Sequence, residues 1–272
     1  MIVAVSDTHL GTERLHGIDP DRESLKAFLR YLRDDLRPDH LVLNGDVEDL
    51  WRRDMRTLTR ESYDVFALLS TLRESGIAVH YVLGNHDWYA RRDAAAREEP
   101  YYESEYVEEV VLESDGVNYA FRHGHGFDPV QREWYFDKLA LVSTDAVGAT
   151  FSEKWAIYAD AEGPSDLVTS VGKLLYDRIT AGSWDDRVLE MDRCETEINL
   201  GVRPPGSGRF VRRRDDVDWL CIGHTHEAGV AADANVANAG AWLGKNHTYL
   251  VLEAEPRLMV WTDGEAVPLD ES

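Results

Sequence analysis

The fold is decided by residues 2–9, which read IVAVSDTH. Ile2 to Val5 form a short apolar run that is typical of a buried strand. Polar residues follow at once, and Asp7 and His9 lie two positions apart. Because residues i and i+2 of an extended chain point to the same side, a carboxylate and an imidazole can reach one site directly after this strand.

Strands and helices alternate through the first part of the chain. Apolar residues recur at helical spacing over residues 25–36 and 65–72, and strands are predicted at 41–43 and 77–83. Asp19-Pro20 is expected to supply the cap and the first-turn proline of the first helix. This alternation predicts an α/β fold with parallel strands joined by right-handed crossovers.

The pattern changes beyond residue 105. A hairpin is predicted over residues 107–121, turning at Asp115-Gly116. Residues from about 128 to 200 are predicted to be mostly helical and are rich in aromatic side chains, and a loop is predicted at 203–208. Strand character returns in four later segments, at 219–222, 230–236, 248–253 and 258–262. We therefore expect one domain over residues 1–272, with a helical insertion at about 128–210.

The charge of the chain is strongly negative. Its 272 residues include 51 acidic and 29 basic side chains, which give a formal net charge of −22, and only five of the basic residues are lysines. An acidic, lysine-poor composition resembles that of proteins from salt-accumulating halophiles, where a Debye length of about 3 Å at molar salt screens self-repulsion. The same charge argues against nucleic acid as a partner, because nucleic-acid binding needs a basic surface.

The remaining composition bounds the class of protein. A hydrophobic content of 43% is enough for a sizeable core and argues against a disordered chain. The sequence contains no run of roughly 18 apolar residues, so no membrane span is predicted. No signal peptide is visible either, and we therefore expect a cytoplasmic protein without stable membrane insertion. The two cysteines, Cys194 and Cys221, cannot build a disulfide framework.

Five polar clusters follow the predicted strands. They are Asp7-Thr8-His9, Gly45-Asp46, Gly84-Asn85-His86-Asp87, His123-Gly124-His125 and Gly223-His224-Thr225-His226. Open α/β sheets bind ligands at the carboxyl ends of their strands, so we expect the clusters to meet in one crevice. Imidazole and carboxylate groups suit Mn, Fe, Zn, Ni or Co, and a carboxylate can bridge two ions. Two ions about 3.5–4 Å apart are a common device for phosphoester hydrolysis.

This ordered series resembles the motifs of the calcineurin-like metallophosphoesterases, from residue 7 to residue 226. The resemblance implies a four-layer α/β/β/α fold, a β-sandwich flanked by helices, with a helical cap. It also implies two divalent metal ions, manganese being expected first. A water molecule activated between the ions would be the nucleophile. The first ion would be held by Asp7, His9, Asp46 and His226, and the second by Asp46, Asn85, His123 and His224, with Asp46 as the bridge.

The resemblance also implies two catalytic residues. His86 would protonate the leaving oxygen or stabilise the charged transition state, and Asp49 would orient His86 and favour its protonated form. A turn or helix cap is the structural alternative for Asp49. His125 would act through its carbonyl or its side chain, or simply pack, and His247 is expected to be structural.

Two branches of the family share further features with the chain. Residues 46–51 (DVEDLW), the helical insertion and residues 238–242 (NAGAW) resemble the UDP-2,3-diacylglucosamine pyrophosphatase branch. That branch commonly carries arginine after the Gly-Asn pair, where this chain has His86. Residues 6–11 (SDTHLG) are similar to the opening motif of the double-strand-break repair nucleases, although the acidic charge argues against a nuclease.

We therefore expect a two-metal phosphoester hydrolase acting on a phosphodiester, a pyrophosphate or a phosphomonoester. The substrate would be a small molecule, nucleotide-linked or lipid-linked. The alternatives are a DNA nuclease, a non-catalytic metal-binding scaffold, and a halophilic structural protein without a site. Because every motif position is filled, His86 included, an enzyme is favoured over a scaffold. The physiological substrate, the native metal pair and the oligomeric state stay open.

Overall fold

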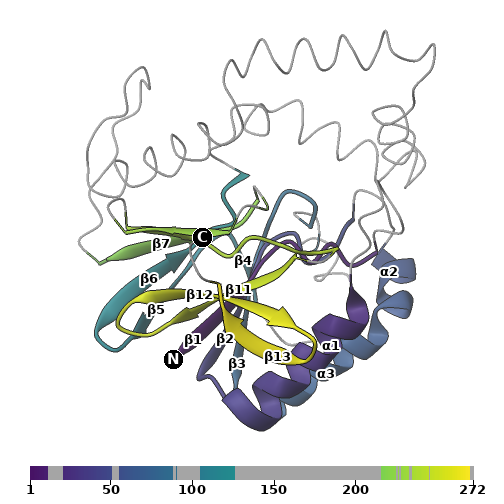
Figure 1. Ribbon diagram of the computed structural model, residues 1–272. Coiled ribbons are helices and arrows are strands. Elements are labelled where there is room, and N and C mark those ends of the chain that lie inside the picture. Colours follow the sequence, from purple (N-terminus) through teal and green to yellow (C-terminus); the bar gives the residue numbers. More distant parts are fainter. Residues whose placement is uncertain are drawn as a thin grey trace, which may run out of the picture.

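The computed structural model describes residues 1–11, 21–50, 55–87, 90, 105–125, 216–224, 226, 228–232, 235–244 and 246–269. These residues form two β-sheets, with helices packed against the larger one (Figure 1). The mixed α/β fold expected from the sequence is confirmed.

The larger sheet has eight strands. They are β1 (Ile2–Val5), β2 (His40–Asn44), β3 (Ala78–Val82), β4 (Tyr106–Val107), β10 (Trp242–Leu243), β11 (Asn246–Leu252), β12 (Pro256–Thr262) and β13 (Glu265–Pro268). Their order is β13-β12-β11-β1-β2-β3-β4, and β10 pairs with β11. β1, β2 and β3 run parallel, as predicted, whereas β11 joins β1 in the antiparallel sense. β4 was not predicted: Val107, expected to begin the hairpin, pairs instead with β3 in the parallel sense.

The smaller sheet has five strands in the order β5-β6-β7-β9-β8. They are β5 (Val110–Ser114), β6 (Val117–Phe121), β7 (Trp219–Ile222), β8 (Gly229–Ala231) and β9 (Val236–Asn238). The predicted hairpin is β5 and β6, which turn at Asp115 and Gly116 with φ values of 51° and 79°. Positive φ at both central residues is typical of a type I′ hairpin turn. β6 and β7 run parallel, so their carboxyl ends meet at the same edge.

Three α-helices are present among the described residues: α1 (Arg22–Tyr31), α2 (Met55–Glu61) and α3 (Tyr63–Glu74). A π-helical turn, Leu32–Leu36, continues α1 and ends at Arg37, which has a left-handed backbone. α1 and α3 lie against one face of the larger sheet (Figure 1). Phe28 of α1 packs there against Trp242, Tyr249 and Trp261.

Alternation along β1 explains why the larger sheet is buried on both sides. Val3 and Val5 face the helices, whereas Ile2 and Ala4 face the smaller sheet. All four side chains are fully buried. A strand that is covered on both faces appears in the sequence as a continuous apolar run, which is what residues 2–5 show.

Two predicted boundaries are wrong. The cap of α1 is Asp21, whose side chain accepts a hydrogen bond from the Ser24 backbone N–H, and not Asp19-Pro20. The segment 230–236 is not one strand but parts of two antiparallel strands, β8 and β9. Asp19 and Asp21 are both aspartates close to the start of the helix, so the sequence alone does not choose between them. In the second segment the chain turns before β9, where Asn235 has a positive φ of 56°.

The helical insertion expected at about 128–210 lies outside the described residues. The helices in the described part of the chain cover the larger sheet, so the second helical layer of the expected four-layer fold stays a prediction. No helix in the described part of the chain is long and apolar enough to cross a membrane. His247 stacks on Trp242, and its Nδ1 atom lies 3.2 Å from Ser24 Oγ, so this histidine joins β11 to the first turn of α1.

Candidate metal centre

The described parts of all five polar clusters lie in loops that follow parallel strands. Asp7 and His9 follow β1, Asp46 follows β2, and Asn85 and His86 follow β3; His123 follows β6, and His224 and His226 follow β7. Backbone hydrogen bonds join these loops, from Asp7 N to Gly45 O and from Gly223 N to His123 O. The two sheets therefore bring these polar loops to one shared edge of the sandwich.

The backbone of these loops is unusual. Nine non-glycine residues in the described part of the chain have positive φ, and five of them belong to the polar clusters: Asp7, His9, Asp46, His224 and His226. Left-handed backbone costs a non-glycine residue roughly 1 kcal/mol and is concentrated at functional sites. Five of these strained positions are therefore concentrated in the loops that carry the candidate ligands.

Two glycines allow the loops to approach closely. A Cβ atom on Gly84 would overlap the Asp46 carboxylate, and one on Gly45 would overlap the His123 ring. Gly45 also has a φ of +86°, which other residues adopt only with strain. The glycines of these motifs are therefore needed for the packing of Asp46 against its neighbours.

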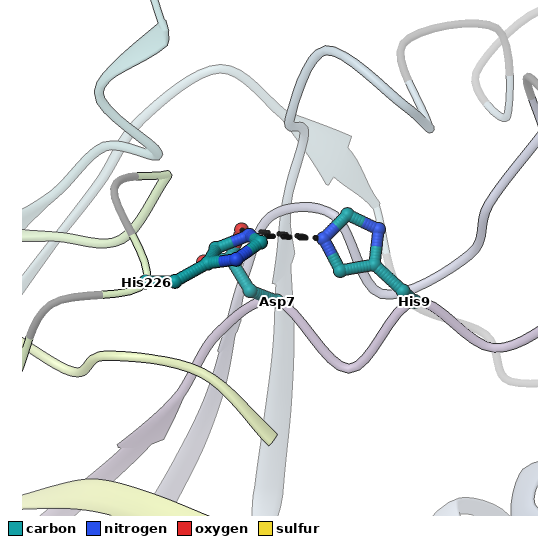
Figure 2. Close-up of side chains that lie close together, drawn as sticks. All are labelled: Asp7, His9 and His226. Carbon is teal, nitrogen blue, oxygen red and sulfur yellow. Dashed lines mark hydrogen bonds and ion pairs between the residues drawn. The ribbon is translucent and has the colours of Figure 1, made fainter. Parts of the chain in front are cut away.

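Asp7 lies at the centre of the first cluster (Figure 2). The rings of His9 and His226 both reach it, and Asp7 Oδ1 lies 3.1 Å from His226 Nε2 and 3.6 Å from His9 Nε2. The two imidazole Nε2 atoms are 3.2 Å apart. One ligand atom from each of the three residues lies within 4.8 Å of the others, which is close enough to surround one ion.

Asp46 lies at the centre of a second cluster. Its Oδ2 atom is 3.2 Å from His123 Nε2, and the ligand atoms of Asp46, His123 and His224 lie within 4.8 Å of one another. Asp46 also groups with His9 and His86 in the same way, so its carboxylate lies between the two sides of the site. Asn85 is buried in the loop between Gly84 and His86, both of which contact Asp46.

His86 and Asp49 form a pair at the edge of these clusters. Asp49 Oδ1 lies 3.0 Å from His86 Nδ1, and His86 Nε2 lies 3.9 Å from Asp46 Oδ2. The histidine is thus held at one ring nitrogen while the other faces the site. Burial lowers the pKa of His86 and outweighs the opposing effect of the Asp46 and Asp49 carboxylates.

Charge balance dominates the electrostatics of the site. Burial opposes the charge on Asp7 and Asp46, but neighbouring imidazoles, His123 foremost, hold the pKa of both carboxylates well below the usual range. Burial also opposes a charge on His123, yet the Asp46 and Asp7 carboxylates raise its pKa to about 10. The pKa of His9 is likewise raised, since Asp7 and Asp46 outweigh the effect of burial.

The donor set fits divalent metal ions. Asp7 Oδ1 and His123 Nε2 are buried and have no hydrogen-bond partner of good geometry among the described residues. Imidazole nitrogen and carboxylate oxygen together suit Mn, Fe, Co, Ni and Zn. His123 Nδ1 lies 2.9 Å from the Asn44 carbonyl oxygen, the kind of contact that orients a metal-ligating imidazole through its other nitrogen.

His125 lies beside the second cluster. Its ring is 5.6 Å from that of His123 and 6.4 Å from that of His224, measured between centroids. Burial, together with the two neighbouring imidazoles, lowers the pKa of His125 to about 3. A neutral imidazole at this position packs against the proposed ligands without adding charge to the site.

Sequence reasoning missed Asn44 and Ser6. The Asn44 side chain donates to the carbonyl oxygens of Arg122 and Cys221, so it joins the end of β2 to the ends of β6 and β7. Ser6 Oγ lies within hydrogen-bond distance of Asp7 Oδ2 and of the Asn44 carbonyl oxygen, and its single proton can be donated to either. The available signal was a polar residue at the end of an apolar strand, since a buried amide needs partners.

A family model of the calcineurin-like phosphoesterases matches residues 1–228. The chain belongs to this family. It is therefore a metal-dependent phosphoesterase, and the clusters around Asp7 and Asp46 are the groups of this calcineurin-like fold that could hold metal ions. No curated protein sequence matches the chain significantly.

Solved structures with a similar fold include phosphoesterases. Yfce, a phosphoesterase from E. coli, is 12% identical, with 97% of this chain and 95% of that chain covered and a TM-score of 0.46. A dimetal phosphatase from Danio rerio is 13% identical, with 98% of each chain covered and a TM-score of 0.45. Vps29 from Entamoeba histolytica is 15% identical, with 99% of each chain covered and a TM-score of 0.40. These likenesses are too distant to transfer an activity.

Metal binding is predicted to release protons. With a pKa of about 10, His123 carries a proton at pH 7 in the metal-free protein, and a metal ion binds only the neutral imidazole. Calorimetric titration with Mn²⁺ in buffers of different ionisation enthalpy should show the release of about one proton or more at pH 7, and the affinity should rise from pH 6 to pH 8. His123→Gln should release fewer protons. An affinity independent of pH would contradict this charge balance.

Proposed function

We propose that the protein is a two-metal phosphoester hydrolase in which Asp46 bridges the ions. The ligands of the first ion are Asp7, His9, Asp46 and His226, and those of the second are Asp46, Asn85, His123 and His224. The observation that carries the proposal is the position of the Asp46 carboxylate, which shares one cluster with His123 and His224 and another with His9 and His86. A carboxylate is the ligand best suited to join two ions.

The metal pair, when bound, supplies Lewis acidity and an activated water molecule for attack on phosphorus. The residues of the chain hold and orient the reacting groups. Asp7 and Asp46 provide the buried negative charge that retains the ions, and the strained backbone at both residues keeps their carboxylates directed into the site. The contact of His123 with the Asn44 carbonyl oxygen orients its Nε2 atom toward Asp46.

His86 is proposed as the group that donates a proton to the leaving oxygen. Its Nδ1 atom is held by Asp49, so its Nε2 atom is directed toward Asp46 and the space where a phosphoester would lie. Asp49 favours the imidazolium form, whereas burial opposes it. The balance between burial and the Asp49 carboxylate therefore sets the fraction of enzyme molecules in which His86 is protonated near neutral pH.

The substrate is proposed to be a small phosphodiester or pyrophosphate, nucleotide-linked or lipid-linked, and the native metal to be manganese. The NAGAW segment (residues 238–242) supports a structural role more directly than a lipid substrate. Asn238 Nδ2 donates to the Gly223 carbonyl oxygen, and the Trp242 backbone N–H donates to the Asp7 carbonyl oxygen. Any phosphoesterase on this fold needs those loops in place.

The acidic and lysine-poor composition supports a cytoplasmic protein working at high salt. Phosphoester hydrolysis by this protein should then persist at molar salt. The same negative charge disfavours the alternative of a nuclease, because the phosphates of DNA would be repelled.

Replacing the bridging carboxylate tests the proposal. Asp46→Asn should lower the rate of bis-p-nitrophenyl phosphate hydrolysis with added Mn²⁺ by at least about 100-fold, because the ions supply several kcal/mol of charge stabilisation. Asp115→Asn is the matched control, since Asp115 has nearly the same backbone conformation, with φ of 51° against 50°, in the remote hairpin turn. Equal activity of the two variants would refute the bridging role.

The proton donor is tested through its partner. Asp49→Asn should lower kcat by roughly 10–100-fold and move the basic limb of the pH–rate profile to lower pH. The sign follows because the Asp49 carboxylate raises the pKa of His86, so its loss makes His86 give up its proton at a lower pH. Asp39→Asn, just before β2 and so at the end of that strand opposite to the site, should change neither quantity. An unaltered pH profile in Asp49→Asn would exclude His86 as the acid.

A further inference from the structure

Asp87 is a buried carboxylate that the proposed metal centre does not use. Its side chain is fully buried and lies one residue beyond His86. Asp87 Oδ2 accepts hydrogen bonds from the Val47 backbone N–H at 2.8 Å and from the Tyr81 hydroxyl at 2.7 Å. Asp87 Oδ1 accepts one from the Gly84 backbone N–H at 2.6 Å. A carboxylate with three donors is well satisfied, even where water is excluded.

The donors come from both loops that flank the second ion site. Val47 directly follows Asp46, and Gly84 directly precedes Asn85. Asp87 therefore joins the loop after β2 to the loop after β3 through one rigid group.

Other contacts between these two loops involve His86. Its backbone N–H donates to Asp46 Oδ1, its carbonyl oxygen accepts from the Leu50 backbone N–H, and its Nδ1 atom pairs with Asp49. The first of them uses a carboxylate that a metal ion would also bind.

Tyr81 connects this carboxylate to the hydrophobic core. Its ring lies on β3, is fully buried between the larger sheet and the helices, and packs 4.8 Å from the ring of Tyr106. A phenol held in a close-packed core has little freedom to move its hydroxyl group. The position of Asp87 is thus set by the core and not by the metal ions.

We infer that Asp87, anchored by Tyr81, is a positioning residue that fixes the separation of Asp46 from Asn85 and thereby the affinity of the site they share. The inference rests on the proposed two-metal function. It assigns to the Asp of the Gly-Asn-His-Asp segment a role distinct from that of the ligands: it brings two ligand loops to the spacing that one ion requires. Displacing the Asn85 loop relative to Asp46 by a fraction of an ångström would weaken the binding of the second ion, which needs both residues. The first ion, held by Asp7, His9 and His226 together with Asp46, does not need Asn85 and would stay in place.

The experiment compares two tyrosine variants that each lose one buried hydroxyl hydrogen bond. Tyr81→Phe removes the donor to Asp87, whereas Tyr119→Phe removes a donor to the Glu253 carbonyl oxygen, remote from the site. Both should lower the unfolding temperature by similar amounts. Mn²⁺ binding and Mn²⁺-dependent hydrolysis are then titrated far below that temperature, in each variant and in the unaltered protein.

Tyr81→Phe should weaken one of the two Mn²⁺ sites by roughly 10-fold, and saturating Mn²⁺ should restore kcat, while the other site stays within about twofold. Asp87→Asn should weaken the same site further. The new amide N–H₂ group cannot accept a hydrogen bond, so at least one of the backbone N–H donors of Val47 and Gly84 would lose its acceptor. Tyr119→Phe should match the unaltered protein. If Tyr81→Phe and Tyr119→Phe bind Mn²⁺ with the same affinities and need the same Mn²⁺ concentration for hydrolysis, the positioning role is overturned. If the unaltered protein itself binds fewer than two Mn²⁺ ions, the two-metal function fails, and the inference fails with it.

Discussion

The structure depends on two buried carboxylates, Asp7 and Asp46, which the chain places among imidazole groups at the edge of a sandwich. Neither is more than 2% exposed. A buried carboxylate is costly unless cations compensate it, and here the imidazoles of His9 and His123, whose pKa values are raised, do so in the metal-free protein. Divalent ions would replace those protons and supply more positive charge. The raised pKa of His123, to about 10, is a consequence of this balance.

The fold serves that arrangement by bringing five strand ends together. β1, β2 and β3 are parallel in one sheet, and β6 and β7 are parallel in the other, so their following loops emerge at one edge. Asn44 joins the two sheets at this edge, and Asp87 joins two loops of the larger sheet. Around the site, several non-glycine residues adopt the less stable left-handed backbone conformation. Glycines at positions 45 and 84 let the candidate ligands pack closely.

Much of this could be predicted from the sequence, because the information is local. The apolar run Ile2 to Val5, the repeated strand and helix alternation, and the Asp-x-His and Gly-His-x-His patterns each concern residues a few positions apart. The parallel core and the meeting of the five clusters followed from them. The cap of α1 was misplaced from Asp21 to Asp19, since both are aspartates that precede the same helix.

Other parts could not be predicted, because they depend on contacts between distant residues. Asn44 looks like the last residue of a strand, and its bonds to the carbonyl oxygens of Arg122 and Cys221 exist only once the sheets have packed. The link from Tyr81 to Asp87 is hidden for the same reason, because Tyr81 resembles an ordinary core aromatic residue. Substrate choice depends on groups outside the metal clusters, and the motifs carry no information about them.

The central claim is that Asp46 lies between two ions. Anomalous diffraction from crystals loaded with Mn²⁺ tests it most directly, because each ion gives its own peak. We expect two peaks about 3.5–4 Å apart, one beside Asp7, His9 and His226 and one beside His123 and His224, with the Asp46 carboxylate contacting both. A single peak, or two peaks of which Asp46 contacts only one, would contradict the account.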